Sequence, residues 1–356
     1  MIKNTGLQNQ TTVNRGAGEE GFTMVELVVS MIIFMIVTGS IYGVLQVAQQ
    51  SRSTVSSQVQ LSKSVRLGLN LVGRDTYSAG YGYPLKNAVI LRDNRVATRL
   101  GVPADTDTSR DTVPPIIAGD NITLNTFNET PSIRTDQVTF LFKDSSFNPV
   151  GTAGSEVSRP LTITAVSATA DQLTVTDGSK CRINDLFLIT GSGGQFTLGM
   201  VTNIVGNIVW FANADVLGFN NPGAANELRS INPVNMLRVK MVTYFVAADG
   251  TLTRREFANV PPPAVAVASV DEPLVYGVED FQIKYVMENG TLVDNPSAGA
   301  DGIAGTPDDD QARLEAVRQI RFTVNARTLE RNSRGELLRE NMTSTFSTKN
   351  LGYDAN

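Results

Sequence analysis

One stretch near the N-terminus decides how this chain is organised, and it reads Gly21-Phe22-Thr23-Met24-Val25-Glu26-Leu27. It leads directly into an apolar run, residues 27–47, that contains no Lys, Arg, Asp or Glu. Because roughly 20 apolar residues suffice for a helix to cross a bilayer, this run predicts a transmembrane helix. Glu26 at its head is unusual, since an isolated charge in hydrocarbon is expensive. The carboxylate therefore predicts a partner.

A secretory signal peptide is the alternative interpretation of the apolar run, since it also places an apolar core near the N-terminus. Three features count against it. The run is longer than the usual ~7 to 15 residues, a carboxylate stands at its head, and no Ala-x-Ala-like exit site is present. We therefore expect a permanent membrane anchor.

The segment at residues 21–27 resembles the type III signal of type IV pilins and type II secretion pseudopilins. In that family, a prepilin peptidase cuts after the Gly and methylates the new N-terminal amine. The resemblance implies that residues 1–21 are a cleaved leader, that the cut lies between Gly21 and Phe22, and that Phe22 becomes N-methylphenylalanine. It also implies a single pass through the bacterial inner membrane, with the head in the periplasm before it joins a filament.

Glu26 would be the fifth residue of the mature chain, close to the amine that cleavage creates at Phe22 of an adjacent subunit. A carboxylate in an apolar helix bundle has to be neutralised, hydrated or paired. Pairing with that amine would give Glu26 an assembly role. The alternative is that Glu26 lies near enough to the headgroups to stay hydrated, which requires no partner.

The helical pattern continues beyond the membrane, with apolar residues spaced mostly by three or four and no Pro before Pro84. We predict one pilin helix over residues 22–79, of which about 27–47 is transmembrane. Its end resembles the helix terminus of PilW-type minor pilins, in which an Arg-Asp pair, here Arg74 and Asp75, is followed by Ala-Gly-Tyr.

The chain after Pro84 predicts a β-rich head, because short alternating apolar runs are separated by Gly, Pro, Asn and Asp. The expected fold class is α+β, with a long N-terminal helix packed on an antiparallel β-sheet. We expect an irregular β segment at 80–160, an inserted small all-β subdomain at 161–215 and a C-terminal antiparallel sheet at 216–356.

The C-terminal part contains the clearest strand signals. Residues 236–246 and 251–257 flank Asp249-Gly250 and predict a hairpin. Two later runs, which begin at Leu274 and at Val317, resemble the last sheet of PilW-like and J-type pseudopilin heads.

An acidic loop in the C-terminal part is a candidate metal site. It places Asp301, Asp308, Asp309 and Asp310 with two Gly within ten residues. Ca²⁺ takes several oxygen ligands on a tightly turning backbone, although the spacing does not fit an EF-hand. Bound Ca²⁺ is one hypothesis and a solvated turn is the other, and we expect no further cofactor.

Composition excludes several kinds of chemistry. The chain has no His, which removes histidine triads and imidazole ligands. Cys181 is the only cysteine, so no intramolecular disulfide can form, and we expect it to be a small core residue. No phosphate-binding Gly loop is present, and a net charge of -5 gives no reason to expect nucleic acid. We expect a protein that is not an enzyme.

Three functions are compatible with these features. The first is a minor pilin of the PilW type that takes part in pilus assembly and twitching motility. The second is the J-type pseudopilin of a type II secretion system, but such pseudopilins are generally shorter, and the insert therefore favours the first. The third is an enzyme or a surface-binding adhesin tethered to the membrane by a single helix, although the head shows no catalytic signature. The expected partners are prepilin peptidase, other major and minor pilins through the N-terminal helix, and the inner-membrane assembly platform.

Overall fold

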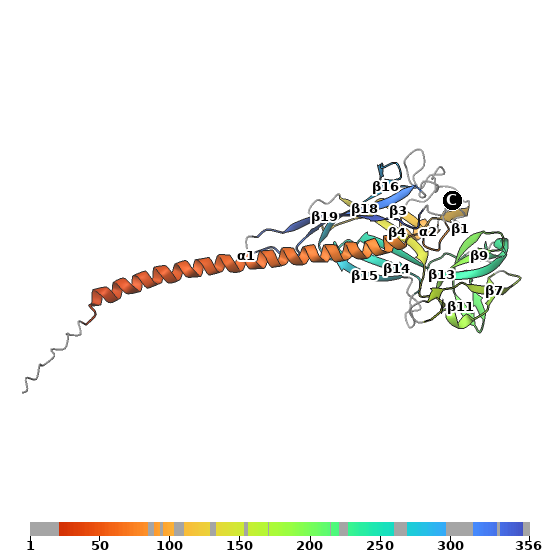
Figure 1. Ribbon diagram of the computed structural model, residues 1–356, viewed down its shortest axis with the longest axis horizontal. Coiled ribbons are helices and arrows are strands. Elements are labelled where there is room, and N and C mark those ends of the chain that lie inside the picture. Colours follow the sequence, from red (N-terminus) through yellow and green to blue (C-terminus); the bar gives the residue numbers. More distant parts are fainter. Residues whose placement is uncertain are drawn as a thin grey trace, which may run out of the picture. The chain divides into compact units, whose positions relative to one another are not determined.

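The computed structural model shows an α+β protein, a long N-terminal helix and a head of antiparallel β-sheets (Figure 1). The residues it describes are 21–84, 89–92, 95–102, 110–128, 133–152, 156–169, 171–213, 215–220, 227–259, 269–296, 316–332 and 335–351. The chain divides into two compact units, Met1–Val55 and Ser56–Asn356. The predicted fold class is therefore confirmed.

Helix α1 (Met24–Ser78) contains 55 residues and crosses the boundary between the two units. It agrees with the helix predicted over 22–79, because the sequence offers no Pro to interrupt it. The helix stops at Gly80, whose φ of +77° lies in the left-handed region that an L side chain rarely adopts. The Gly80 N–H then donates to the Leu141 carbonyl, which ties the helix end to the head.

The head is built from short strands and a few short helical segments. In chain order these are β1 (Val89–Arg92), α2 (Arg95–Leu100), β2 (Arg110–Val113), β3 (Ile116–Leu124), β4 (Arg134–Lys143), β5 (Pro149–Val150), β6 (Val157–Ser158), β7 (Leu161–Val166), β8 (Gln172–Val175), η1 (Gly178–Lys180), β9 (Leu186–Gly191), β10 (Phe196–Met200), β11 (Asn203–Val205), β12 (Ile208–Trp210), α3 (Glu227–Ile231), β13 (Pro233–Val246), β14 (Leu252–Phe257), β15 (Ser269–Val275), β16 (Val278–Met287), β17 (Leu292–Val293), β18 (Val317–Arg327) and β19 (Arg339–Ser347). The predicted hairpin corresponds to β13 and β14, which pair from Met241↔Phe257 to Val246↔Leu252.

Strand β13 organises the larger sheet. The first half of this 14-residue strand pairs with β9 and β7, and its second half pairs with β4 and β14. The short runs expected within 161–211 are β7 to β12, and Figure 1 shows β7, β9 and β11 together at one end of the head. The region expected as an insert is thus hydrogen-bonded to the same long strand as the rest of the head.

The second sheet has four strands in the order β17-β16-β18-β19. Side chains of β16 alternate between buried and half-buried along the strand, as the alternating sequence predicts. Phe281 of β16 stacks on Phe322 of β18 with 6.0 Å between ring centroids. This apolar face turns toward the second half of α1.

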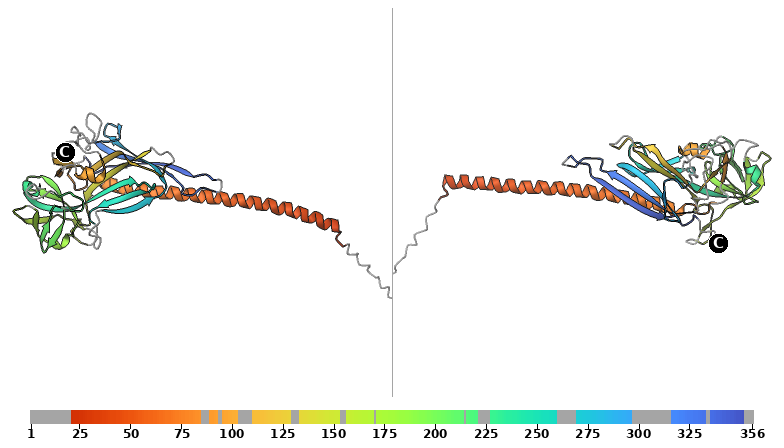
Figure 2. Two further views of the ribbon diagram at one scale, coloured as in Figure 1. Left: turned by 180° about the vertical axis from the view of Figure 1, so that it is seen from behind. Right: turned by 90° about the horizontal axis from the view of Figure 1, so that it is seen from above.

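The largest apolar cluster lies between α1 and the two sheets. The helix contributes Leu61, Val65, Leu69 and Val72, which follow the three-to-four-residue spacing of one helix face. Gly68 and Gly73 let the backbone approach: a Cβ at Gly68 would meet Val275 of β15, and a Cβ at Gly73 would overlap the Phe346 ring of β19. This part of α1 therefore lies between β15 and β19 (Figure 2).

Candidate functional site

The start of α1 is closed by a reciprocal pair of hydrogen bonds between Thr23 and Glu26. The Glu26 N–H donates to Thr23 Oγ1 at 3.3 Å, and the Thr23 N–H donates to Glu26 Oε2 at 3.0 Å. The Thr23 hydroxyl also donates to the same carboxylate oxygen at 2.9 Å. This arrangement is a capping box, which satisfies backbone donors that a helix N-terminus leaves unpaired.

The capping box gives Glu26 a local role that the sequence interpretation missed. The signal was present, because Thr-x-x-Glu before an apolar run is the sequence signature of such a box. In a single chain the carboxylate thus has neighbours of its own, and a partner from another subunit would have to compete with Thr23. Pairing of Glu26 with an amine remains a prediction.

The predicted cleavage site lies just before this cap. Gly21, Phe22 and Thr23 are exposed and belong to no helix or strand, and α1 starts at Met24. A peptidase must bind the residues around a scissile bond in an accessible chain, and the exposed segment meets that requirement. The structure places Gly21, Phe22 and Glu26 within one turn of the helix start.

The N-terminal part of α1 exposes apolar side chains around its whole circumference. Its most apolar window has a mean hydropathy of 2.3 and no residue buried against the chain itself, and it is long enough to cross a membrane. Phe34 and Tyr42 are both 71% exposed. A helix that is apolar on every side requires lipid or other apolar helices around it.

The second half of α1 is fixed to the head by a buried ionic group. Asp75 is 3% exposed, and its carboxylate accepts hydrogen bonds from Arg254 Nε at 2.9 Å and from the Tyr244 hydroxyl at 2.7 Å. Burial raises the pKa of Tyr244, and the Asp75 charge raises it further, so this hydroxyl stays a donor. Asp75 belongs to the Arg-Asp pair singled out in the sequence, whereas Arg74 beside it is largely exposed.

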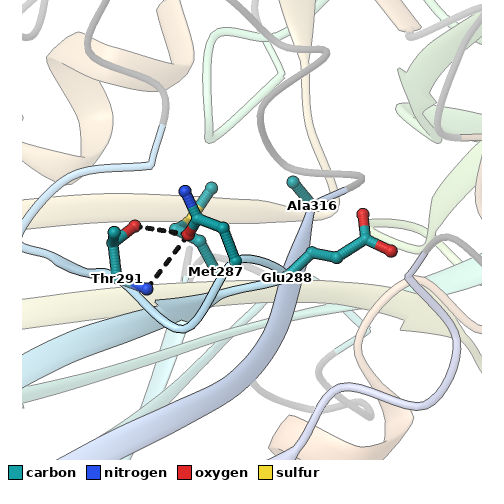
Figure 3. A pocket seen from close by; sticks show the side chains of 5 residues that line it. Met287, Glu288, Thr291 and Ala316 are labelled. Carbon is teal, nitrogen blue, oxygen red and sulfur yellow. Dashed lines mark hydrogen bonds between the residues drawn. The ribbon is translucent and has the colours of Figure 1, made fainter.

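The predicted metal ligands Asp301, Asp308, Asp309 and Asp310 lie outside the described residues. Ala316, the first described residue after this loop, lines a hollow of about 350 Å³ together with Met287 and its neighbours in the chain. There Asn289 Oδ1 accepts hydrogen bonds from the Thr291 N–H at 3.0 Å and hydroxyl at 2.7 Å (Figure 3).

The single carboxylate in the described lining of this hollow is that of Glu288. It points away from the Asn289–Thr291 turn (Figure 3) and pairs with Arg318 at 3.0 Å. Across the described part of the chain, no group of three or more His, Cys, Asp or Glu side chains is placed to hold a metal ion. The Ca²⁺ hypothesis therefore rests on the acidic loop alone.

Cys181 lies in the apolar cluster between β7 to β12 and β13, and it is 6% exposed. Burial raises the pKa of its thiol to about 12, and Asp185 contributes in the same direction. The reactive thiolate form is thus disfavoured at neutral pH.

Comparison with known families places a motif on the N-terminal segment. Residues 17–42 match the family model described as the prokaryotic N-terminal methylation motif. The match includes Gly21, Phe22, the capping box and most of the apolar run, up to residue 42. Comparison with curated proteins finds no match. The motif expected from the sequence is confirmed.

Proposed function

We propose that this protein is a type IV pilin-like minor pilin, cleaved between Gly21 and Phe22, that contributes to the start or the tip of a pilus. The methylation motif implies processing by prepilin peptidase and assembly with other pilins in general, and the apolar helix implies a membrane-anchored chain. The observation that carries the proposal is the position of this motif, at the capped start of an uninterrupted 55-residue helix. That helix ends in the core of a large β head.

The head supports a minor rather than a major subunit. Strands β7 to β12 extend the larger sheet beyond the strands that pack on α1 and add surface to the head. A major subunit repeats along the whole filament, so its head must pack against identical heads at every position. A subunit present in few copies can carry a larger head, because it does not have to meet that requirement. The role proposed for the head is therefore structural: it depends on packing and on contacts with other subunits rather than on catalysis.

Assembly follows from the exposed apolar helix. Before assembly, lipid surrounds residues 27–47, and the head stays on the periplasmic side. In the filament the apolar surface packs against the helices of neighbours, which replaces lipid contacts with side-chain packing. Cleavage creates an amine at Phe22, and the Glu26 carboxylate of an adjacent subunit exchanges part of its bonding with Thr23 for that amine. This pairing sets the axial register.

The alternative is the J-type pseudopilin of a type II secretion system, because residues 21–27 also resemble the signal of that family. Deletion of the gene separates the two functions. Loss of pili and twitching with normal secretion supports the minor pilin. Loss of secretion of a folded substrate with intact pili and twitching supports the pseudopilin.

Mass spectrometry of sheared filaments tests the proposal directly. We expect a peptide that begins with N-methylated Phe22, at low abundance relative to the major subunit. A Gly21→Val variant provides the matched control, because it blocks cleavage and leaves the capping box, which begins two residues later at Thr23, unchanged. Filaments that contain the chain with its residues 1–21 intact, or no chain at all, would overturn the proposal.

A further inference from the structure

Among the residues that the structure describes, β19 (Arg339–Ser347) is the last strand of the head, and no strand pairs with its second edge. Its neighbour in the four-stranded sheet is β18, and all nine residues pair with it without a bulge. Exposed and half-buried residues alternate along β19, and none is buried. Its side chains face either the solvent or α1, whereas its backbone also has an outward edge.

The pairing pattern shows which backbone groups point outward. The Thr348 N–H donates to the Arg318 carbonyl at 3.1 Å. At the other end, the Thr328 N–H donates to the Leu338 carbonyl at 2.9 Å. In an antiparallel pair, hydrogen-bonded and non-hydrogen-bonded positions alternate, so the even-numbered residues of β19 bond to β18. The outward N–H and C=O groups belong to Asn341, Thr343, Thr345 and Ser347.

Two other edges of the head, β15 and β17, are protected against pairing with another chain, and β19 is not. Edge β15 contains Pro273, which has no N–H to donate, and it exposes the charged side chains of Asp271 and Glu272. Its pairing with β14 also shifts in register next to Leu252. Proline, charge and irregularity are the usual means of blocking an edge. Edge β17 has two residues. By contrast, residues 341–347 form seven paired positions without charge, Pro or Gly.

The open edge adjoins the helix that serves assembly. Glu340, near the start of β19, accepts hydrogen bonds from Gln58 at 3.4 Å and Ser62 at 3.3 Å. Phe346, near its end, contacts Gly73 of the same helix. Strand β19 therefore runs in the same direction as α1, and its edge continues the surface of that helix. A neighbour that packs on α1 comes within reach of this edge.

We propose that the outward edge of β19 pairs with an extended segment of a neighbouring pilin-like subunit, which adds a strand to the four-stranded sheet. This inference rests on the proposed function, since it requires a filament. The fitting segment has about seven uncharged residues that alternate in polarity. The apolar side chains of this segment would lie next to Met342 and Phe346, on the face of the sheet that packs on α1. Its small polar side chains would lie next to Thr343 and Thr345, on the opposite face.

The direction of β19 argues against a pair of two identical edges. Two copies that joined β19 to β19 antiparallel would be related by a two-fold axis normal to the sheet, and their α1 segments would run in opposite directions. Subunits of one filament point the same way. The neighbour must therefore supply a different segment, in a contact that is not two-fold symmetric.

Amide hydrogen exchange, resolved to single residues, tests the proposal on the full chain. The chain extracted from membranes in detergent is compared with the chain in sheared filaments. We expect the amides of Asn341, Thr343, Thr345 and Ser347 to exchange at least about tenfold more slowly in filaments, because they gain hydrogen bonds. The even-numbered amides, already bonded to β18, change less.

Proline scanning gives a second readout. Thr343→Pro removes an outward donor, whereas the matched control Thr343→Ala removes the same side chain but keeps the N–H. We expect the Pro variant to lose incorporation into filaments and the Ala variant to keep it. If the Pro variant melts below the Ala variant in detergent, the exchange measurement on the unaltered chain decides.

The outcomes separate the two proposals. Filaments that contain the chain but leave the four outward amides in fast exchange overturn the β19 proposal alone. Equal incorporation of a stable Pro variant does the same. Outward amides that are already slow in a dimeric, detergent-extracted chain overturn the choice of partner, since they indicate a two-fold pair. A chain absent from all filaments overturns the proposed function and this inference together.

Discussion

Asp75 of α1 and Arg254 of β14 form a buried ion pair that joins the long helix to the larger sheet. The Nε–Oδ2 distance is 2.9 Å, and the two residues are 3% and 8% exposed. Arg254 also lies 3.2 Å from Glu256, and the hydroxyl of Tyr244 donates to Asp75. The Asp75 carboxylate on α1 thus bonds to side chains of two strands, β13 and β14. These bonds fix the position of this part of the helix along its axis relative to the sheet.

The first prediction concerns this pair. Asp75→Asn leaves the Arg254 charge buried with less compensation, and we expect a loss of about 3 kcal/mol in the free energy of unfolding. Denaturant unfolding of the full chain in detergent measures it. Arg74→Ala serves as the control, since Arg74 is two-thirds exposed and its loss is expected to cost under about 1 kcal/mol. Equal effects of the two variants would contradict a structural role of Asp75.

The second prediction concerns pH and Asp136 of β4. Its carboxylate accepts hydrogen bonds from the Asn121 N–H at 2.8 Å and from the Ile283 N–H at 2.7 Å, so it links β4 to β16. Burial raises its pKa to about 7, with further contributions from Asp120 and Asp294. The folded state therefore holds the proton more tightly than the unfolded state does.

The sign of this effect is that stability from Asp136 is present at low pH and is lost as pH rises. Between about pH 5 and 7 we expect the free energy of unfolding to fall by on the order of 1 kcal/mol per pH unit from this group. Lys284, paired with Asp294 nearby, keeps its charge throughout this range. Unfolding at several pH values measures the slope, and Asp136→Asn should remove it. An unchanged slope in that variant would assign the effect to another group.

The third prediction separates the two roles of Glu26. Glu26→Gln keeps the shape of the capping box, because Gln also serves at this position, but it removes the charge. We expect normal cleavage of this variant. We also expect at least about tenfold less of the chain in filaments, because the variant loses an ion pair in an apolar environment. Thr23→Ala removes the cap at a cost of ~1 kcal/mol and keeps the charge. Quantitative immunoblots of membranes and sheared filaments compare the variants.

The result of that comparison discriminates between the hypotheses. If Glu26→Gln enters filaments as well as the unaltered chain, the carboxylate has no pairing role and capping explains the residue. If Thr23→Ala fails and Glu26→Gln succeeds, the helix start rather than the charge governs assembly.

The fourth prediction concerns the close approach of α1 to β19. Gly73→Ala places a Cβ into the Phe346 ring, and we expect a loss of roughly 1 to 3 kcal/mol in the free energy of unfolding through overpacking. Gly43→Ala is the control, since its Cβ would meet nothing within 4 Å and would favour the helix. A Gly73→Ala variant as stable as the control would show that the strand moves away without cost.

The methylation motif, the membrane-capable run and the extent of α1 could be predicted because each depends on residues close together in the chain. The capping box was missed, although Thr23 and Glu26 are three residues apart and carry the required side chains. The acidic loop at 301–310 stays a prediction, since it lies outside the described residues.

The strand runs of the head were readable from alternation, but their partners were not. Nothing local indicates that β13 pairs with four strands, or that β7 to β12 share it with the rest of the head. Likewise, the sequence motif contains the Arg-Asp pair at 74–75, but only the structure shows that Asp75 is buried and Arg74 exposed.

By itself, the sequence determined a membrane-length helix that follows a methylation motif and has a carboxylate at its head, because hydropathy, helix periodicity and such a motif are properties of neighbouring residues. Tertiary structure alone decided that Asp75 meets Arg254, 179 residues away, and that β19 is left with an open edge. The physical reason is that ion pairs and strand order arise from contacts between distant segments, and those exist only once the chain has packed.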